Sequence, residues 1–196
     1  TGLRLRLEEI EASEPGEDVE AALREVDRLS QMVDELLLLS SAGERDAPAA
    51  EIALGDAASS AVSRFSAAAA DRDVTITAAG EGGVVRCARV DLDRAIDSLV
   101  ENAVNYSPRG GIVEIVAGAL SIEVLDSGPG LGPGEAEAVF ERFHRGRAGR
   151  SGRSGTGLGL PIARELMRRW HADVTIETRP EGGARAAIRF GEVEST

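Results

Sequence analysis

Four of the eight residues from 152 to 159 are glycines, and they lie directly before a segment with helical character in the sequence SGRSGTGLGLPIAREL (151–166). Such a loop costs conformational entropy to order, so a flexible linker is one interpretation. The other is a phosphate-binding loop, in which backbone N–H groups at a helix N-terminus approach an anion. No Lys-Ser/Thr pair follows, as it would in a P-loop, and the segment does not open a βαβ unit as a dinucleotide-binding loop would. The stretch alone leaves both interpretations open.

Strand and helix patterns alternate along the rest of the chain without the regular spacing of βαβ units. We expect helices over about 55–71, 91–105 and 158–170. We expect strands over 74–78, 84–87, 112–116 and 120–126, and a closing hairpin over 174–190. This order indicates an α+β protein, a two-layer sandwich in which helices cover one face of a mixed sheet.

The first part of the chain has a different pattern and predicts a helical hairpin. A Pro-Gly break separates two helical stretches, and from about Asp18 apolar residues such as Ala22 and Val26 recur at alternating steps of four and three. This heptad spacing is typical of helices that pack in a bundle. The predicted domains are a helical hairpin over 1–43, a linker over 44–51 and a globular domain over 52–196.

Charge and composition narrow the classes of partner. The net charge of −12 disfavours non-specific binding to nucleic acid. The chain contains no lysine, and five arginines without any acidic residue lie between Arg142 and Arg153, which suits a polyphosphate but also a solvated loop. No apolar run is long enough to span a bilayer. The single cysteine, Cys87, excludes an internal disulfide, argues against a zinc site and is simplest to explain in a reducing compartment.

Four further stretches occur in a defined order: DSLVENAVNYSP (97–108), DSGPG (126–130), FERFHRG (140–146) and GTGLGL (155–160). In order and spacing they resemble the N, G1, F and G2 boxes of sensor histidine kinases, whose ATP-binding domains have the Bergerat-type ATPase fold. VDRLSQMVDELLLLS (26–40) likewise resembles the second helix of the dimerisation and phosphoacceptor hairpin of these kinases. The resemblance covers nearly the whole chain.

The resemblance implies a role for individual residues. Asn102 would bind Mg²⁺ through its amide oxygen, Tyr106 would pack on the adenine, and Asp126 would accept a hydrogen bond from the adenine amino group. Asn102 and Arg145 are the candidate catalytic residues, with Arg145 reaching the phosphates from an ATP lid over 144–156. The candidate ATP-binding residues are Ser98, Asn102, Asn105, Tyr106, Asp126, Gly128, Gly130, Phe143, Arg145, Gly155, Thr156, Gly157, Leu158 and Gly159.

Three features depart from the family pattern. Ser98 replaces the usual first Asn of the N box, and Asn105 replaces a basic residue, so two polar contacts to metal or phosphate are weakened or replaced. The phosphoacceptor histidine stands in a His-Glu-x-x-Thr-Pro-Leu box in the family, and TGLRLRLEE (1–9) resembles the residues that follow it. We therefore expect the acceptor to lie just upstream of Thr1, in a truncated hairpin, and expect neither His144 nor His171 to replace it.

The expected function is that of the ATP-binding catalytic part of a sensor histidine kinase, with ATP and Mg²⁺ as cofactors. Such a protein passes the γ-phosphoryl group to histidine and then to an aspartate of a response regulator receiver domain. The resemblance also implies a homodimer formed through the hairpin, no nucleic-acid partner, and a cytoplasmic domain of a membrane-anchored sensor. A degenerate nucleotide-binding module that acts by docking stays open as the alternative, whereas an ATP-hydrolysing relative is disfavoured because Ser98 stands where those proteins carry Glu.

Overall fold

A computed structural model describes residues 48–142, 144 and 156–191, together with Val19, Ala22 and Val26. The chain divides into two units, residues 1–43 and 44–196. In the first unit Val19, Ala22 and Val26 are helical, and the rest of the predicted hairpin lies outside the described residues. The elements of the second unit are β1 (Ala50–Ala53), α3 (Leu54–Asp71), β2 (Thr75–Ala79), β3 (Val84–Cys87), α4 (Arg89–Tyr106), β4 (Ile112–Ala117), β5 (Ser121–Leu125), α5 (Glu135–Ala138), α6 (Gly159–Arg168), β6 (Ala172–Thr178) and β7 (Ala184–Phe190).

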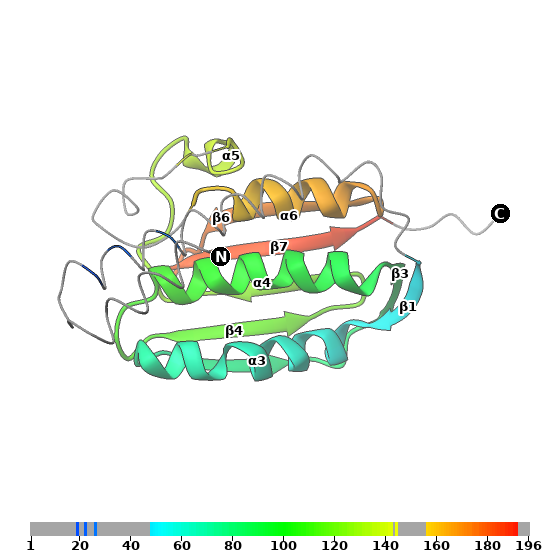
Figure 1. The fold of residues 1–196 in the computed structure, drawn as a ribbon, viewed down its shortest axis with the longest axis horizontal. Helices are drawn as coiled ribbons and strands as arrows, with labels where there is room; N and C mark the ends of the chain where they lie inside the picture. The colour runs from blue at the N-terminus through cyan, green and yellow to red at the C-terminus, as the bar shows by residue number, and fades with distance from the viewer. Residues whose placement is uncertain are drawn as a thin grey trace. The chain divides into compact units, whose positions relative to one another are not determined.

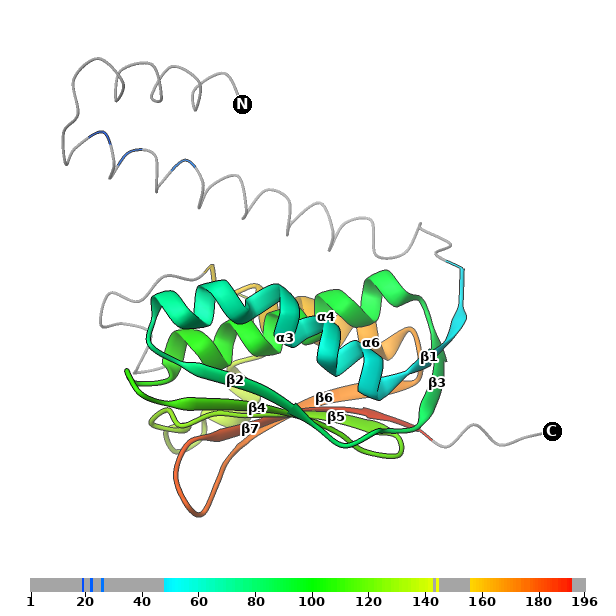
Figure 2. The ribbon, with the colours of Figure 1, turned by 90° about the horizontal axis from the view of Figure 1, so that it is seen from below.

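The second unit is built on a five-stranded mixed sheet with the strand order β2-β4-β5-β7-β6. β2 and β4 are parallel, and every other pair in this sheet is antiparallel. The helices α3, α4 and α6 lie on one face of the sheet, with α4 between the other two (Figures 1 and 2). The predicted α+β sandwich with helices on one face of a mixed sheet is therefore confirmed.

The central helix α4 is held in the layer by its apolar stripe. Leu92, Ile96 and Leu99 recur at steps of four and three and are fully buried. This spacing gives a helix one continuous apolar face, and full burial of a Leu-sized side chain contributes about 1.5–3 kcal/mol. On the outer side of the layer, Arg64 of α3 donates to Asp97 of α4 at 2.6 Å. The buried stripe and this ion pair together hold α4 in the helix layer and so fix the position of its C-terminal end.

Two elements were not expected from the sequence. β1 forms a separate two-stranded antiparallel sheet with β3, pairing Ala50 with Cys87 and Ala53 with Val84. β1 begins inside the stretch predicted as a linker. The sequence did not predict this strand because Ala-Glu-Ile-Ala shows no alternation, and the segment is extended by pairing with a distant strand. The short helix α5 is a single turn that follows the DSGPG loop.

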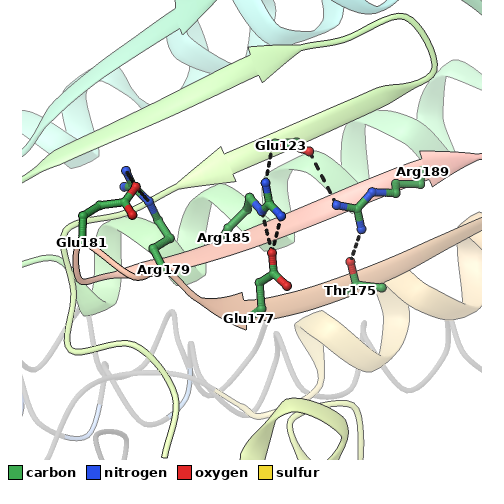
Figure 3. Close-up of polar contacts among 7 residues, drawn as sticks. All are labelled: Glu123, Thr175, Glu177, Arg179, Glu181, Arg185 and Arg189. Carbon is green, nitrogen blue, oxygen red and sulfur yellow. Dashed lines mark hydrogen bonds and ion pairs between the residues drawn. The ribbon is translucent and has the colours of Figure 1, made fainter.

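Paired charges cover part of the sheet face that carries no helices. Glu123 of β5 lies 3.6 Å from both Arg185 and Arg189 of β7, as Figure 3 shows. Arg185 also pairs with Glu177, and Arg189 donates to Thr175 of β6 at 2.8 Å. The alternation of these residues with buried ones places charge on one face and the core on the other, as expected for a sheet with one open face.

A buried polar pair joins the start of α4 to the end of α6. The indole Nε1 of Trp170 donates to Oδ2 of Asp91 at 2.8 Å, and the Asp91 residue is only 5% exposed. Arg169 lies 3.9 Å from the same oxygen. Because buried carboxylates need partners, this contact fixes the far ends of two helices that pack side by side.

We expect Trp170→Phe to lower the free energy of unfolding by about 1–3 kcal/mol, because it leaves the Asp91 carboxylate buried with a donor removed. Urea unfolding followed by far-ultraviolet circular dichroism measures this loss. In an Asp91→Ala background the same Trp170 substitution should cost much less. Equal costs in the two backgrounds would show that the hydrogen bond does not contribute.

Within the described part of the chain, no helix combines the length and the apolarity needed to cross a membrane. Cys87, at the end of β3, is fully buried. Burial, followed by the negative charges of Asp91 and Asp93, raises the pKa of its thiol to about 11. The thiol therefore stays protonated and unreactive at neutral pH.

Candidate functional site

Asp126 is the most strongly constrained polar residue of the site predicted from the sequence. It follows the last residue of β5, is 5% exposed, and accepts two backbone hydrogen bonds at Oδ1, from Gly128 at 2.7 Å and Ala184 at 3.0 Å. All hydrogen bonds that the described residues make to this side chain go to Oδ1. The arrangement therefore fixes the carboxylate through one of its two oxygens, and Oδ2 accepts no hydrogen bond from the described residues.

Burial raises the pKa of the Asp126 carboxyl above its ordinary value. The backbone hydrogen bonds from Ala184 and Gly128, and then the positive charge of Arg179, act in the opposite direction. A buried carboxylate with a raised pKa destabilises the folded protein when it is ionised. Groups with such perturbed pKa values are frequent at functional sites.

The DSGPG loop after β5 packs against the turn between β6 and β7. A side chain at Gly183, where φ is +84°, would overlap the carbonyl oxygen of Asp126. Gly130 has a φ of +71°, and a Cβ there would lie 2.7 Å from Cγ2 of Thr178. Both glycines thus serve close approach between two parts of the chain, which only glycine permits at these backbone angles. Gly128 and Gly130 are candidate ATP-binding residues, and the structure shows that glycine at both positions gives room to neighbouring parts of the protein.

The end of α4 brings the N-box residues to this loop. Tyr106 is the last residue of the helix, and a Cβ on Gly128 would lie 3.0 Å from its carbonyl oxygen. Asn102 and Asn105 lie on the last turns of the same helix and are half-buried. Two of the predicted boxes, which are separated in the sequence by β4 and β5, therefore meet at the end of α4.

The start of α6 meets α4 one turn further along. A Cβ on Gly159 would lie 3.6 Å from both Cβ and Oγ of Ser98, so the first residue of α6 lies against the predicted N-box position. Thr156 accepts a hydrogen bond at Oγ1 from the backbone N–H of Leu158 at 3.2 Å, and Leu158 is fully buried. Gly157 lies between these two residues. The first turn of a helix presents unpaired N–H groups, so this end of α6 is suited to an anion.

Arg164 of α6 binds α5 and the first residue of the F box. Its guanidinium donates to both carboxylate oxygens of Asp173, at 2.9 and 3.2 Å, and to Glu137 of α5 at 2.8 Å. Its Cζ also lies 4.5 Å from the ring centroid of Phe140. Phe140, the first residue of the F box, thus packs against Arg164 in a cation–π contact.

Three of the predicted site residues, Phe143, Arg145 and Gly155, lie outside the described residues, as does most of the predicted lid over 144–156. Their roles stay predictions. The described candidates form three groups that meet around α4. These are Ser98, Asn102, Asn105 and Tyr106 on α4, Asp126, Gly128 and Gly130 after β5, and Thr156, Gly157, Leu158 and Gly159 at the start of α6.

The donor set around Asn102 can be compared with the needs of Mg²⁺. Among the described residues, no group of three His, Cys, Asp or Glu side chains could hold a metal ion by itself. Mg²⁺ in proteins is usually bound by one or two oxygen ligands together with substrate phosphates and water. A single half-buried amide oxygen fits a cation that arrives with a polyphosphate.

Sequence reasoning missed the residues of the β6–β7 turn that hold the DSGPG loop. Thr178 accepts a hydrogen bond from the backbone N–H of Leu131 at 2.9 Å, and Arg179 donates to the carbonyl oxygen of Asp126 at 3.3 Å. The Gly-Gly pair at 182–183 predicts a turn with positive φ. Nothing in the sequence indicates that this turn lies against a loop some fifty positions earlier.

Residues 87–194 match the family model described as histidine kinase-, DNA gyrase B-, and HSP90-like ATPase. Over 187 residues the chain is 33% identical to the sensor protein IrlS of Burkholderia pseudomallei, which covers 91% of this chain and 40% of the relative. It is 36% identical over 173 residues to the sensor-like histidine kinase SenX3 of Mycobacterium tuberculosis, with 84% and 42% covered. The chain thus spans about two fifths of the length of these curated relatives.

Solved structures agree in fold. A complex of histidine kinase ThkA with the response regulator protein TrrA matches with a TM-score of 0.75 at 20% identity, covering 98% of this chain and 56% of that chain. Full-length ShkA in complex with AMPPNP matches with a TM-score of 0.74 at 22% identity, covering 87% and 37%. The chain belongs to the histidine kinase-, DNA gyrase B-, and HSP90-like ATPase family, within which its relatives are sensor histidine kinases. The resemblance inferred from the four boxes is confirmed.

Proposed function

We propose that this chain binds Mg-ATP and supplies its γ-phosphoryl group to a histidine, for relay to an aspartate of a response regulator. The observation that carries the proposal is the buried Asp126, whose Oδ1 accepts two backbone N–H groups while Oδ2 accepts none from the described residues. A fixed, ionised acceptor of this kind discriminates between ligands by their donors. Adenine presents an amino group to it, whereas guanine presents a carbonyl at the corresponding position.

The other two groups of residues are suited to the rest of the nucleotide. Tyr106 would pack against the base, and the first turn of α6 would face the phosphates with its free N–H groups. Asn102 would hold Mg²⁺ together with phosphate oxygens, and Ser98 and Asn105 add polar atoms on the same helix. The bound metal would neutralise negative charge on the phosphates. Catalysis by these residues then consists mainly of positioning and charge neutralisation, with Arg145 as the proposed cationic partner.

We expect neither of the two histidines of the sequence to accept the phosphoryl group. His171 follows α6 at the end opposite Gly159, and ten helical residues separate the two ends by roughly 15 Å. The Nε2 atom of His144 is buried. In-line transfer needs a nitrogen held next to the γ-phosphate, which a helix of a dimerisation hairpin would supply. Homodimerisation through residues 1–43, a membrane-anchored sensor and a receiver-domain partner belong to the same proposal.

A nucleotide-binding module that acts by docking is the second candidate. The observation that favours it is Ser98, whose short side chain lies against Gly159 where the family pattern has an amide. Such a module would bind ATP and transfer nothing. Binding and transfer therefore have to be measured separately.

Calorimetric titration of the chain with ATP and GTP in the presence of Mg²⁺ tests the binding step. We expect ATP to bind and GTP to bind at least tenfold more weakly, and we expect chelation of Mg²⁺ to weaken ATP binding. Equal affinity for the two nucleotides would overturn the role of Asp126. The transfer step is tested on the natural full-length protein with γ-labelled ATP, where acid-labile and alkali-stable label is expected. ATP binding without such label would support the docking module.

A further inference from the structure

The turn between β6 and β7 holds both ends of the DSGPG loop through two adjacent side chains. Thr178, the last residue of β6, uses one hydroxyl to accept from the N–H of Leu131 at 2.9 Å and to donate to the Leu131 carbonyl at 3.3 Å. Arg179 donates from a guanidinium nitrogen to the carbonyl of Asp126 at 3.3 Å. The loop is therefore held at its first residue by Arg179 and just past its last residue by Thr178.

The Arg179 side chain is itself fixed. Two of its guanidinium nitrogens donate to Oε1 of Glu181, at 3.0 and 2.6 Å (Figure 3), and its backbone N–H donates to the carbonyl of Gly183 at 3.0 Å. A guanidinium held in this way loses less conformational freedom when it binds a carbonyl. Hydrogen bonds within the turn thus hold Arg179 in the orientation in which it contacts Asp126.

Close packing reinforces the two hydrogen-bonded ends. The Cγ2 methyl group of Thr178 lies 2.7 Å from the point where a Cβ of Gly130 would stand, and the backbone of Gly183 lies directly against Asp126. The carbonyl of Ala184 accepts a hydrogen bond from the backbone N–H of Asp126 at 3.0 Å, and the Ala184 N–H donates to Oδ1 of the Asp126 side chain at 3.0 Å. Movement of the turn would therefore displace the carboxylate, because the same few residues contact the loop from one side.

We propose that Thr178 and Arg179 are positioning residues for nucleotide selectivity, acting through the DSGPG loop on the Asp126 carboxylate. The inference rests on the proposed binding of ATP at this site. It assigns to the β6–β7 turn a task that is distinct from stability. The strength of a hydrogen bond depends on its distance and angle, so a shift of the Asp126 carboxylate would weaken the contact that distinguishes adenine from guanine.

Thr178→Val tests the proposal, because valine keeps the shape of threonine and has a methyl group in place of the hydroxyl. We expect the ratio of ATP to GTP affinity, measured by calorimetry with Mg²⁺, to fall by about fivefold to tenfold, since Leu131 loses its partner at both backbone atoms. Thr178→Ser retains the hydroxyl and should restore most of the ratio. Arg179→Met should lower the ratio in the same direction.

Thr175→Val is the matched control. It makes the same substitution on the same strand and removes a hydroxyl that accepts from Arg189 on the open face at 2.8 Å. We expect it to leave the nucleotide ratio unchanged. Measurements at temperatures where circular dichroism shows every variant folded separate selectivity from stability. An unchanged ratio in Thr178→Val, or an equal fall in Thr175→Val, would overturn the inference. If the unsubstituted chain shows no preference for ATP, the proposed function fails instead.

Discussion

Replacing Gly183 with alanine is expected to lower the free energy of unfolding more than any other single methyl group added to the described part of the β6–β7 turn. The residue has a φ of +84°, which costs an L-residue about 1–2 kcal/mol. A Cβ there would also overlap the carbonyl oxygen of Asp126, and relief by backbone movement costs about 1–3 kcal/mol more. The expected loss is therefore about 2–5 kcal/mol, measured by urea unfolding.

The neighbouring Gly182 provides the control. Its φ is +100°, yet nothing lies within 4 Å of a Cβ built on it. Gly182→Ala should therefore show the backbone cost alone. The difference between the two variants measures the close approach of the turn to Asp126. Equal losses would mean that the overlap is relieved without cost, and the turn would not constrain the carboxylate.

Asp126→Asn is expected to reduce ATP affinity at least tenfold, about 1.4 kcal/mol, without destabilising the protein. Asparagine keeps an oxygen that can accept from Gly128 and Ala184, but it presents an amide N–H₂ where the carboxylate would accept from the nucleotide. Calorimetry with ATP measures the affinity. Glu123→Gln, a change of the same kind on the open face of β5, should leave the affinity unaltered.

The stability of Asp126→Asn follows from the sign of the pKa shift. Because the native pKa is raised above the unfolded value of about 3.9, the native state holds the proton more tightly. The protonated residue therefore adds stability below the unfolded pKa, and this contribution is lost as pH rises through the native pKa. At pH 7 the ionised side chain burdens the fold, so the neutral asparagine should leave the free energy of unfolding equal or higher. A clear loss of stability at pH 7 would contradict the conclusion that burial raises the pKa of this carboxyl.

The elements that the sequence predicted well are those whose pattern is local. The apolar steps of α4 and the alternation of β4 and β5 are complete within each segment, so their bounds differ from the expectation by only a few residues. Two candidate site residues also lie beside the elements where the sequence predicted them. These are Asp126 at the end of a strand and Leu158 at the start of a helix.

What the sequence could not predict depends on contacts between distant segments. β1 is a strand because β3 pairs with it, and Asp91 is tolerated in the core because Trp170, which follows α6, donates to it. The support of Asp126 by the β6–β7 turn is of the same kind. Turn residues such as Gly183 indicate a local bend, but the surface against which the bend packs is decided only when the sheet has formed.

The hydrogen bond between Trp170 and Asp91 also makes the tryptophan fluorescence of the chain sensitive to the packing of its helices. The sequence has one tryptophan and one tyrosine, and they lie at opposite ends of α4. Tyr106 ends α4 beside the DSGPG loop, whereas Trp170 follows α6 and contacts the start of α4. Emission from the single indole therefore reports whether the two helices remain packed, and phenol absorbance reports the surroundings of the loop. Unlabelled protein thus carries separate intrinsic probes for the integrity of its helix layer and for events at its candidate ligand site.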